Sequence, residues 1–387
     1  MPRVDITNRM AELEKRRTVT LTVTEDCNLR CRYCYEPNKS RERYMSLEVA
    51  QEAISFYMQD ESELEAVEFD FFGGEPMLAF DLIREVVDWF HQREWSRNHL
   101  FFIGTNGTLL TDEMKSWLVA NKQCVYMGIS LDGNKTAHDL NRSNSYDRVR
   151  ENLPFFMEHW PDQPVKMTIS AETIPHVADS IIDLEELGVL FSANVVFENI
   201  WGTPEQKAEL LETYRQQLER LVEYYLCHPD LVPATLLNRR VEMINVGRPA
   251  GEECIRWCGA GHEMMVIGVD GGRYPCHRFR PWVTGREVPT GPVNHQASWR
   301  PEMCTNCRLV SLCPTCAGYN WQENGDSGLR TTYHCEAFKL EVLASARLQA
   351  LRLLQRQPEE LVNLSSDELY QTKLRLDAIL DFAEHGI

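Results

Sequence analysis

The chain has 387 residues and a formal net charge of −18; hydrophobic residues make up 43% of it and charged residues 25%. This length can hold two domains with a substantial core, and the composition excludes a disordered or fibrous protein. The acidic charge argues against a nucleic-acid partner, and the lack of a signal-peptide core or a bilayer-length apolar run predicts a cytoplasmic protein outside the membrane.

Strand-like and helix-like segments alternate along the first half of the chain. A short charged helix is expected within residues 1–17, and the β-branched residues 18–23 predict the first strand. Apolar residues at helical spacing predict a helix in each interval that follows. The five further strands that we expect cover residues 66–72, 100–104, 125–130, 165–170 and 194–198. Six consecutive βα units predict an α/β fold with a parallel sheet, open or barrel-like.

Three cysteines follow the first strand with the spacing C-x3-C-x2-C: Cys27, Cys31 and Cys34. Structural zinc normally has four protein ligands, but the nearest histidine in the sequence is His91. Three thiolates on a four-iron cluster would leave one iron open for a cofactor or substrate. We therefore favour an iron–sulfur cluster over the alternative, a redox-inert zinc knuckle.

Eight more cysteines lie within 82 residues in the second half of the chain: Cys254, Cys258, Cys276, Cys304, Cys307, Cys313, Cys316 and Cys335. The total of 13 is odd and there is no export signal, so metal ligation is favoured over disulfides. Eight thiols make two four-ligand sites, for which zinc is again the alternative to iron. Cys124 and Cys227 are left over, and we expect both to be buried free thiols.

The three-cysteine loop, with the aromatic Tyr33 before its last cysteine, resembles the cluster loop of the radical S-adenosylmethionine (SAM) superfamily. The later cysteines resemble the SPASM extension of those members that modify peptides and proteins. The resemblance implies a partial (β/α)6 barrel over residues 18–240, a SPASM domain over 241–336 and C-terminal helices over 337–387. It also implies SAM and three [4Fe-4S] clusters as cofactors, one of them binding SAM and two auxiliary.

The family's interleaved pattern implies the ligands of the auxiliary clusters. The first cluster would be held by Cys254, Cys258, Cys276 and Cys316. The second would be held by Cys304, Cys307, Cys313 and Cys335. The chain departs from the family at Cys313-Pro314-Thr315-Cys316, where the usual spacing is C-x3-C.

Residues at the expected strand ends resemble the SAM-binding positions of the superfamily. Gly73, Gly74 and Glu75 match the GGE motif, whose backbone and carboxylate hold the methionine ammonium. Arg142 matches an arginine that pairs with the SAM carboxylate, and a surface arginine is the alternative. The other expected contacts are Tyr33 with the adenine, Ser130 with the ribose or methionine end, Asn106 as a polar strand end, and Glu198 with the adenine or the substrate.

The resemblance implies hydrogen abstraction from a residue of a ribosomally made peptide or protein, with a thioether or carbon–carbon cross-link as the expected product. The first alternative is a sulfatase-maturing enzyme, which makes formylglycine. Such enzymes place an Asp after the cysteine equivalent to Cys276, where this chain has His277. We expect His277 to be the proton acceptor facing the substrate. A non-catalytic Fe–S electron carrier is the alternative from another class.

The expected partners are a precursor peptide or protein and an electron donor such as flavodoxin or ferredoxin. Only 17 residues precede the first expected strand, so we expect no fused leader-binding module. A separate leader-binding protein would then select the substrate, unless the barrel mouth or the SPASM surface does so.

Overall fold

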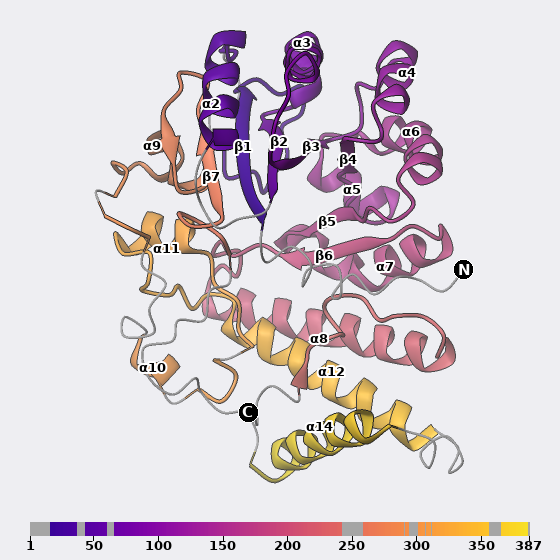
Figure 1. The fold of residues 1–387 in the computed structure, drawn as a ribbon. Coiled ribbons are helices and arrows are strands. Elements are labelled where there is room, and N and C mark those ends of the chain that lie inside the picture. The colour runs from indigo at the N-terminus through magenta and orange to yellow at the C-terminus, as the bar shows by residue number, and fades with distance from the viewer. Residues whose placement is uncertain are drawn as a thin grey trace.

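The computed structural model describes most of the chain and shows strands wrapped by helices, with long helices packed beneath them (Figure 1). The described residues are 16–36, 43–59, 66–241, 258–289, 291–293, 301–305, 307–310, 312–355 and 365–385. Cys254 and most of the expected N-terminal helix lie outside the described residues.

Six strands run parallel in chain order and form the framework of the fold. The strands are β1 (Arg16–Thr24), β2 (Ala66–Gly73), β3 (Asn98–Thr105), β4 (Val125–Ile129), β5 (Val165–Ile169) and β6 (Phe191–Val195). β1 to β4 pair in parallel, as do β5 and β6. A parallel bridge between Ser130 and Lys166 joins the end of β4 to β5. The predicted α/β fold is confirmed.

One strand lies earlier than expected. β6 covers Phe191–Val195 and not 194–198. Phe191 and Ala193 are buried, whereas Asn194 is exposed. The apolar run 195–197 suggested a later strand, but the alternating burial that defines this one begins right after the turn at Gly188, whose φ of 69° is left-handed.

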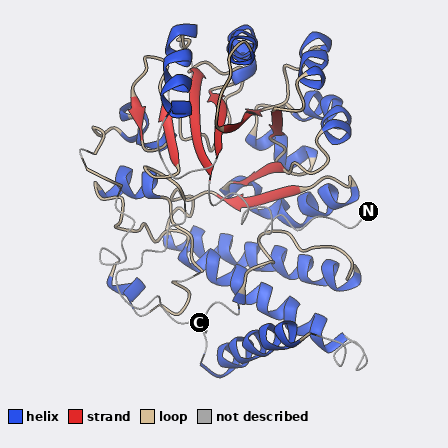
Figure 2. Ribbon diagram, in the orientation of Figure 1, coloured by secondary structure: helices blue, strands red, loops and turns tan. Residues whose placement is uncertain are grey.

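Helices cover the outer face of the strands, as the blue ribbons in Figure 2 show. They are α2 (Leu47–Gln59), α3 (Phe80–His91), α4 (Asp112–Ala120), α5 (Lys135–Asn141), α6 (Tyr146–His159) and α7 (Val177–Glu186), with 3-10 turns η1 (Pro76–Ala79) and η2 (Ala171–His176). Helix α5 was not expected from the sequence. Its signal is Asn134, whose side chain accepts a hydrogen bond from Ala137 N and caps the helix.

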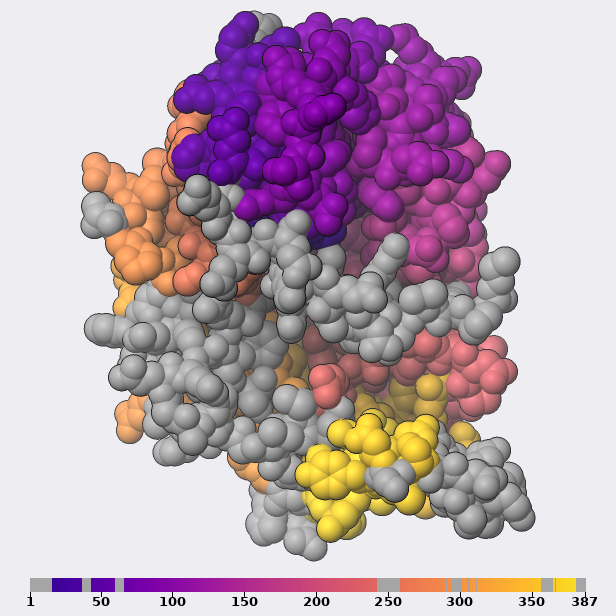
Figure 3. Space-filling model, viewed as in Figure 1, coloured from indigo at the N-terminus to yellow at the C-terminus, as the bar shows by residue number. Residues whose placement is uncertain are grey.

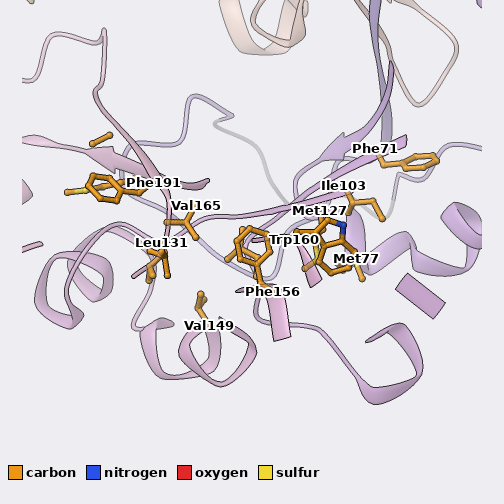
Figure 4. Packing of buried hydrophobic residues seen from close by; sticks show 14 of the residues in the cluster. Phe71, Met77, Ile103, Met127, Leu131, Val149, Phe156, Trp160, Val165 and Phe191 are labelled. Atoms are coloured by element: carbon orange, nitrogen blue, oxygen red, sulfur yellow. The ribbon is translucent and has the colours of Figure 1, made fainter. Parts of the chain in front are cut away.

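The hydrophobic core fills the space between the strands and these helices. Figure 4 shows Phe71, Ile103 and Met127 of β2, β3 and β4 together with Phe156 and Trp160 at the end of α6. In β1, the alternate residues Val19, Leu21 and Val23 enter this core. The intervening threonines of β1 therefore face the inner side of the barrel.

The second cysteine region, the segment from 254 to 335 that carries the eight later cysteines, adds two strands to the main sheet. This feature was not expected from the sequence. β7 (Met264–Ile267) pairs in parallel with β1, and β8 (Arg273–Tyr274) pairs antiparallel with β7. The sheet order is β4-β3-β2-β1-β7-β8. Short helical segments follow: η4 (His277–Phe279), α9 (Pro281–Thr284), α10 (Glu302–Thr305) and α11 (Ala317–Asn324).

Three long helices form the remaining layer. They are α8 (Pro204–Cys227), α12 (Cys335–Gln355) and α14 (Ser366–His385). Tyr214 of α8 donates a 2.8 Å hydrogen bond to Glu341 of α12, and Ser365 and Glu368 form the expected capping box before α14. In Figure 3, α14 lies at the opposite end of the molecule from the first βα units. In the described part of the chain, no helix is long and apolar enough to cross a bilayer.

Candidate active site

The three-cysteine loop begins where β1 ends, at the carboxyl edge of the parallel strands. Its first turn is fixed locally, because Asp26 N donates to Thr24 Oγ1 at 3.0 Å and Cys27 N donates to Asp26 Oδ1 at 2.8 Å. Arg32 N donates to Asn141 O at 3.0 Å and anchors the loop to the end of α5. Cys27 is buried, whereas Cys31 and Cys34 are partly exposed.

Gly73 and Gly74 bring the end of β2 against this loop. A Cβ on Gly73, whose φ is 150°, would lie 2.0 Å from Thr24 O, and one on Gly74 would lie 2.1 Å from Asp26 O. Glu75 N donates to Asp26 O at 2.8 Å. The close approach that these glycines permit is therefore one between two parts of the chain, which fixes the loop in place.

The Glu75 carboxylate is buried under the same turn and accepts three hydrogen bonds. Oε1 accepts from Thr105 Oγ1 at 2.5 Å and from Met77 N at 3.1 Å, and Oε2 accepts from Asn106 N at 2.8 Å. Burial raises the pKa of Glu75, and these donors oppose the shift. Oε2 has one donor and keeps the capacity for a second, such as an ammonium group.

Asp132 is the centre of a buried network that the sequence did not single out. Its Oδ2 accepts from Arg142 Nε and from Tyr33 Oη, both at 2.9 Å, and its Oδ1 accepts from Thr168 N at 2.9 Å. Asn141 Nδ2 adds a bond of 3.2 Å. Burial alone would lower the pKa of Arg142, but the Asp132 carboxylate raises it. The network fixes Tyr33 and Arg142 beside the cysteine loop.

The charge of Arg142 is therefore already paired with Asp132, but only one of its three guanidinium nitrogens makes that bond. Nε donates to Asp132, and no hydrogen bond of the two Nη nitrogens is found among the described residues. The guanidinium carbon lies 5.4 Å from the centre of the Tyr33 ring. The Nη nitrogens can donate to a planar carboxylate, and the pairing of Arg142 with the SAM carboxylate stays a prediction.

Asn106 and Ser130 lie at the ends of β3 and β4, as expected. Asn106 Nδ2 donates to Asn28 Oδ1 of the cysteine loop at 2.8 Å. Ser130 N donates to Thr105 O at 3.1 Å, and Ser130 is paired across the strands with Lys166. Glu75 and Asn106 thus both contact the cysteine loop, and Ser130 lies beside Thr105 at the end of the neighbouring strand.

A cavity of about 360 Å³ lies beside the cysteine loop. Its lining includes Tyr33, Cys34 and Tyr35 of the loop, Glu172 of η2, and Glu198 after β6. Glu198 forms an ion pair with Arg278 of η4. Neither Tyr35 nor Arg278 was predicted as a site residue, because the sequence gives no sign that η4 reaches the loop.

His277 lies between two aromatic rings. Its ring centre is 5.4 Å from that of Tyr35 and 5.0 Å from that of Phe72, and both pairs are stacked. Burial, followed by the neighbouring Arg280 and Arg278, lowers the pKa of His277 to about 3. The structure thus places His277 beside the three-cysteine loop, and its role as a proton acceptor stays a prediction.

Cys258, Cys276 and Cys316 come together next to this histidine. Burial raises the pKa of Cys276 to about 12, and the nearby Cys316 and Cys258 thiolates add to the shift. A Cβ on Gly318 would lie 3.5 Å from Cys276 Sγ, so the start of α11 packs against the thiol. Cys254, the fourth expected member, is outside the described residues.

Cys304, Cys307, Cys313 and Cys335 form a second group. Burial raises the pKa of Cys313 to about 12; Arg330 opposes the shift, and the other three thiolates add to it. His334 Nε2 lies 3.7 Å from Cys313 Sγ. The grouping follows the interleaved pattern that the family resemblance implied, even though the two groups alternate along the sequence.

Both groups and the loop consist of soft thiolate donors, which fit iron–sulfur clusters. Among the described residues, no three His, Cys, Asp or Glu side chains are arranged to hold a single metal ion. Thiolates of a four-iron cluster bind different iron atoms, so that finding concerns single-ion sites. The expectation for the leftover thiols is wrong for Cys227, which is exposed at the end of α8, while Cys124 is half-buried.

Comparisons with known proteins agree with this geometry. The profile of the Radical SAM superfamily matches residues 21–179. The chain is 23% identical over 357 residues to a cysteine-type anaerobic sulfatase-maturating enzyme of Clostridium perfringens, covering 81% of this chain and 91% of the relative.

Two solved structures share the fold. Native anSMEcpe with bound AdoMet and the Cp18Cys peptide has a TM-score of 0.65 at 19% identity, covering 88% of this chain and 99% of that one. Streptococcus suis SuiB bound to its precursor peptide SuiA has a TM-score of 0.54 at 16% identity, covering 84% of this chain and 79% of that one.

Proposed function

Residues 21–179 make this chain a member of the radical SAM superfamily, and we propose that it abstracts hydrogen from a residue of a ribosomally made peptide. The observation that carries the proposal is a cavity that is lined by the three-cysteine loop and is joined by one ion pair to the Cys276 turn, the turn formed by Cys276 and η4. Cys34 lines this cavity directly, and Glu198 in its wall is paired with Arg278, two residues after Cys276. A substrate in the cavity would contact the three-cysteine loop and the Glu198 side chain that pairs with Arg278.

In this proposal the predicted residues hold the cofactors. Cys27, Cys31 and Cys34 would bind a four-iron cluster, which on reducing bound SAM would supply a 5′-deoxyadenosyl radical. The Nη nitrogens of Arg142, for which no hydrogen bond is found in the described part of the chain, would donate to the SAM carboxylate, while Glu75 Oε2 would accept from the ammonium. Asp132 holds Arg142 and Tyr33 in position, so it would act on SAM through them.

The two further cysteine groups would hold auxiliary [4Fe-4S] clusters. Cys258, Cys276 and Cys316 with Cys254 would form the first set, and Cys304, Cys307, Cys313 and Cys335 the second. In these positions the clusters would accept the electron left after bond formation. A cross-link as product, a cytoplasmic location, an electron-donor protein and a leader-binding partner stay predictions.

Sulfatase maturation is the second candidate, favoured by the likeness to the clostridial enzyme over most of both chains. His277, at the position where those enzymes resemble one another in having Asp, argues against it. Incubation of the reconstituted enzyme with SAM, a reductant and Cp18Cys separates the two. Conversion of the cysteine to formylglycine, detected by mass spectrometry, would replace our proposal with this one.

The proposal itself is tested by anaerobic reconstitution. Three clusters predict about twelve iron atoms per chain, and reductant should yield 5′-deoxyadenosine from SAM. A small peptide encoded beside the gene, where one is found, is the candidate precursor, and its mass should change only when SAM and reductant are both present. Iron binding without any SAM cleavage would instead support an electron carrier.

A further inference from the structure

The ion pair between Glu198 and Arg278 joins parts of the chain 80 positions apart. Arg278 Nη2 donates to Glu198 Oε1. Glu198 lies in the segment after β6 and lines the 360 Å³ cavity, and Arg278 lies in η4 beside the Cys276 turn. The pair therefore bridges the barrel and the second cysteine region at the edge of the cavity.

Each partner has one further polar atom that is buried and makes no hydrogen bond within the described residues. These atoms are Arg278 Nη1, a donor, and Glu198 Oε2, an acceptor. Buried polar groups nearly always have partners, because losing water without replacement is costly. The donor Arg278 Nη1 and the acceptor Glu198 Oε2 would both be satisfied by a ligand that presents an acceptor and a donor side by side.

The pair is held rigidly, as a recognition element must be. The guanidinium carbon of Arg278 lies 4.6 Å from the ring centre of Tyr35 and 5.7 Å from that of Tyr319. Tyr319 Oη accepts from Asn199 N at 3.3 Å, which ties the residue after Glu198 to the same ring. A Cβ on Gly318 would lie 2.5 Å from Arg278 Cβ, so glycine there permits the arginine's position.

We propose that Glu198 and Arg278 bind the backbone of one extended residue of the peptide substrate. Arg278 Nη1 donates to the carbonyl oxygen of that residue, and Glu198 Oε2 accepts from its N–H. In an extended chain these two groups of one residue point to the same side, as they do in a hydrogen-bonded antiparallel pair. The inference rests on the proposed function and assigns Glu198 to the substrate.

The adenine of SAM also presents a donor next to an acceptor, so it is the competing occupant. The position of the pair favours the peptide. Tyr33, with Arg142 and Asp132, forms the barrel side of the site. Glu198 and Arg278 instead connect the cavity to the Cys276 turn, the side from which a substrate would reach the second cysteine region.

The test uses reconstituted enzyme with SAM and a phage-displayed library of random 18-residue peptides. One enriched peptide is synthesised with each backbone amide replaced in turn by an ester, which removes a single N–H without adding bulk. On the wild type, one replacement should weaken binding at least tenfold, as measured by anaerobic fluorescence anisotropy. If no position along the peptide weakens binding, the proposal is wrong.

Glu198→Gln is the decisive variant, because it keeps the shape of the side chain but puts an amide donor where the spare acceptor was. In this variant the same ester should change affinity less than twofold, while SAM affinity stays within twofold of the wild type. Glu212→Gln is the matched control, since Glu212 also pairs with an arginine, Arg215, on the exposed face of α8. It should retain the wild-type ester pattern.

Three outcomes would overturn the inference in distinguishable ways. A loss of SAM affinity in Glu198→Gln with unchanged peptide affinity would assign the pair to adenine. An equal ester effect in wild type and variant would place the backbone contact elsewhere. If SAM is cleaved but no peptide is enriched on the wild type, the proposed peptide substrate fails, and the inference fails with it.

Discussion

Arg280 offers the strongest test of how the two cysteine regions are joined. Its side chain is 0% exposed, and Nη2 donates to Glu36, two residues after Cys34 and itself 8% exposed. Nε donates to His277 O at 2.9 Å, and the guanidinium lies 5.1 Å from the ring centre of Trp282. Arg280 therefore links the three-cysteine loop to the Cys276 turn through one buried charge pair.

Arg280→Met should leave the Glu36 carboxylate buried without its charge partner. Removing one member of a buried ion pair typically lowers the free energy of unfolding by about 3–5 kcal/mol. Replacing both members by apolar residues of similar volume is often neutral or stabilising, so Glu36→Met/Arg280→Met should recover most of that loss. The two single variants, the double variant and the wild type make a double-mutant cycle.

The assay is anaerobic urea unfolding of the reconstituted proteins, followed by tryptophan fluorescence. Arg220→Met is the control, because Arg220 pairs with Asp179 at 2.5 Å on the surface and should cost at most about 1 kcal/mol. The reasoning is refuted if Arg280→Met costs no more than Arg220→Met. It is also refuted if the double variant is less stable than both single variants.

Four further predictions concern the site. Replacing Cys27, Cys31 and Cys34 with Ala should lower the iron content from about twelve to about eight atoms and abolish SAM cleavage; zinc in place of iron would contradict it. Arg142→Ala should weaken SAM binding by about 2–5 kcal/mol in a titration, and Glu75→Gln should also bind SAM more weakly, while both variants keep the iron–sulfur cluster. Unchanged SAM affinity in both variants would refute the assignment of Arg142 and Glu75 to SAM. His277→Gln should retain iron and SAM cleavage but lose the peptide product, so full product yield would reject the proton-acceptor role. Burial raises the pKa of Asp70 from 3.8 to about 7, so the folded state favours the protonated carboxyl. The contribution of Asp70 to the free energy of unfolding is therefore complete below pH 3.8 and is lost as the pH rises toward 7. Relative to Asp70→Asn, the wild type should lose about 2–3 kcal/mol of unfolding free energy between pH 5 and pH 8 in urea titrations, and equal pH dependence would contradict this.

The features that could be predicted from the sequence have local signals. Strand-like segments between helix-like ones indicated six parallel strands, the last of them three residues too late, and Cys27, Cys31 and Cys34 lie within eight positions of one another. Even α5 has a local signal in its Asn134 cap, although its seven residues are too few for a clear helical period.

The features that were missed depend on contacts distant in sequence. The role of Asp132 depends on Tyr33, which lies 99 positions away. Glu198 and Arg278 are separated by 80 positions, and Glu36 and Arg280 by 244. Charged residues of these kinds are frequent on any surface, so nothing in their spacing distinguishes the pairs before the fold brings them together.

The pairing of β7 with β1 limits how this protein can be divided. β1 lies between β2 and β7, and the β7 pairing covers residues Thr18–Leu21 of the strand that leads into the three-cysteine loop. A fragment ending near residue 240 would leave this side of β1 with open backbone hydrogen-bonding groups, a template for aggregation. The barrel therefore should not be produced without β7. A chimera that exchanges the second cysteine region must keep β7 of this chain together with the barrel.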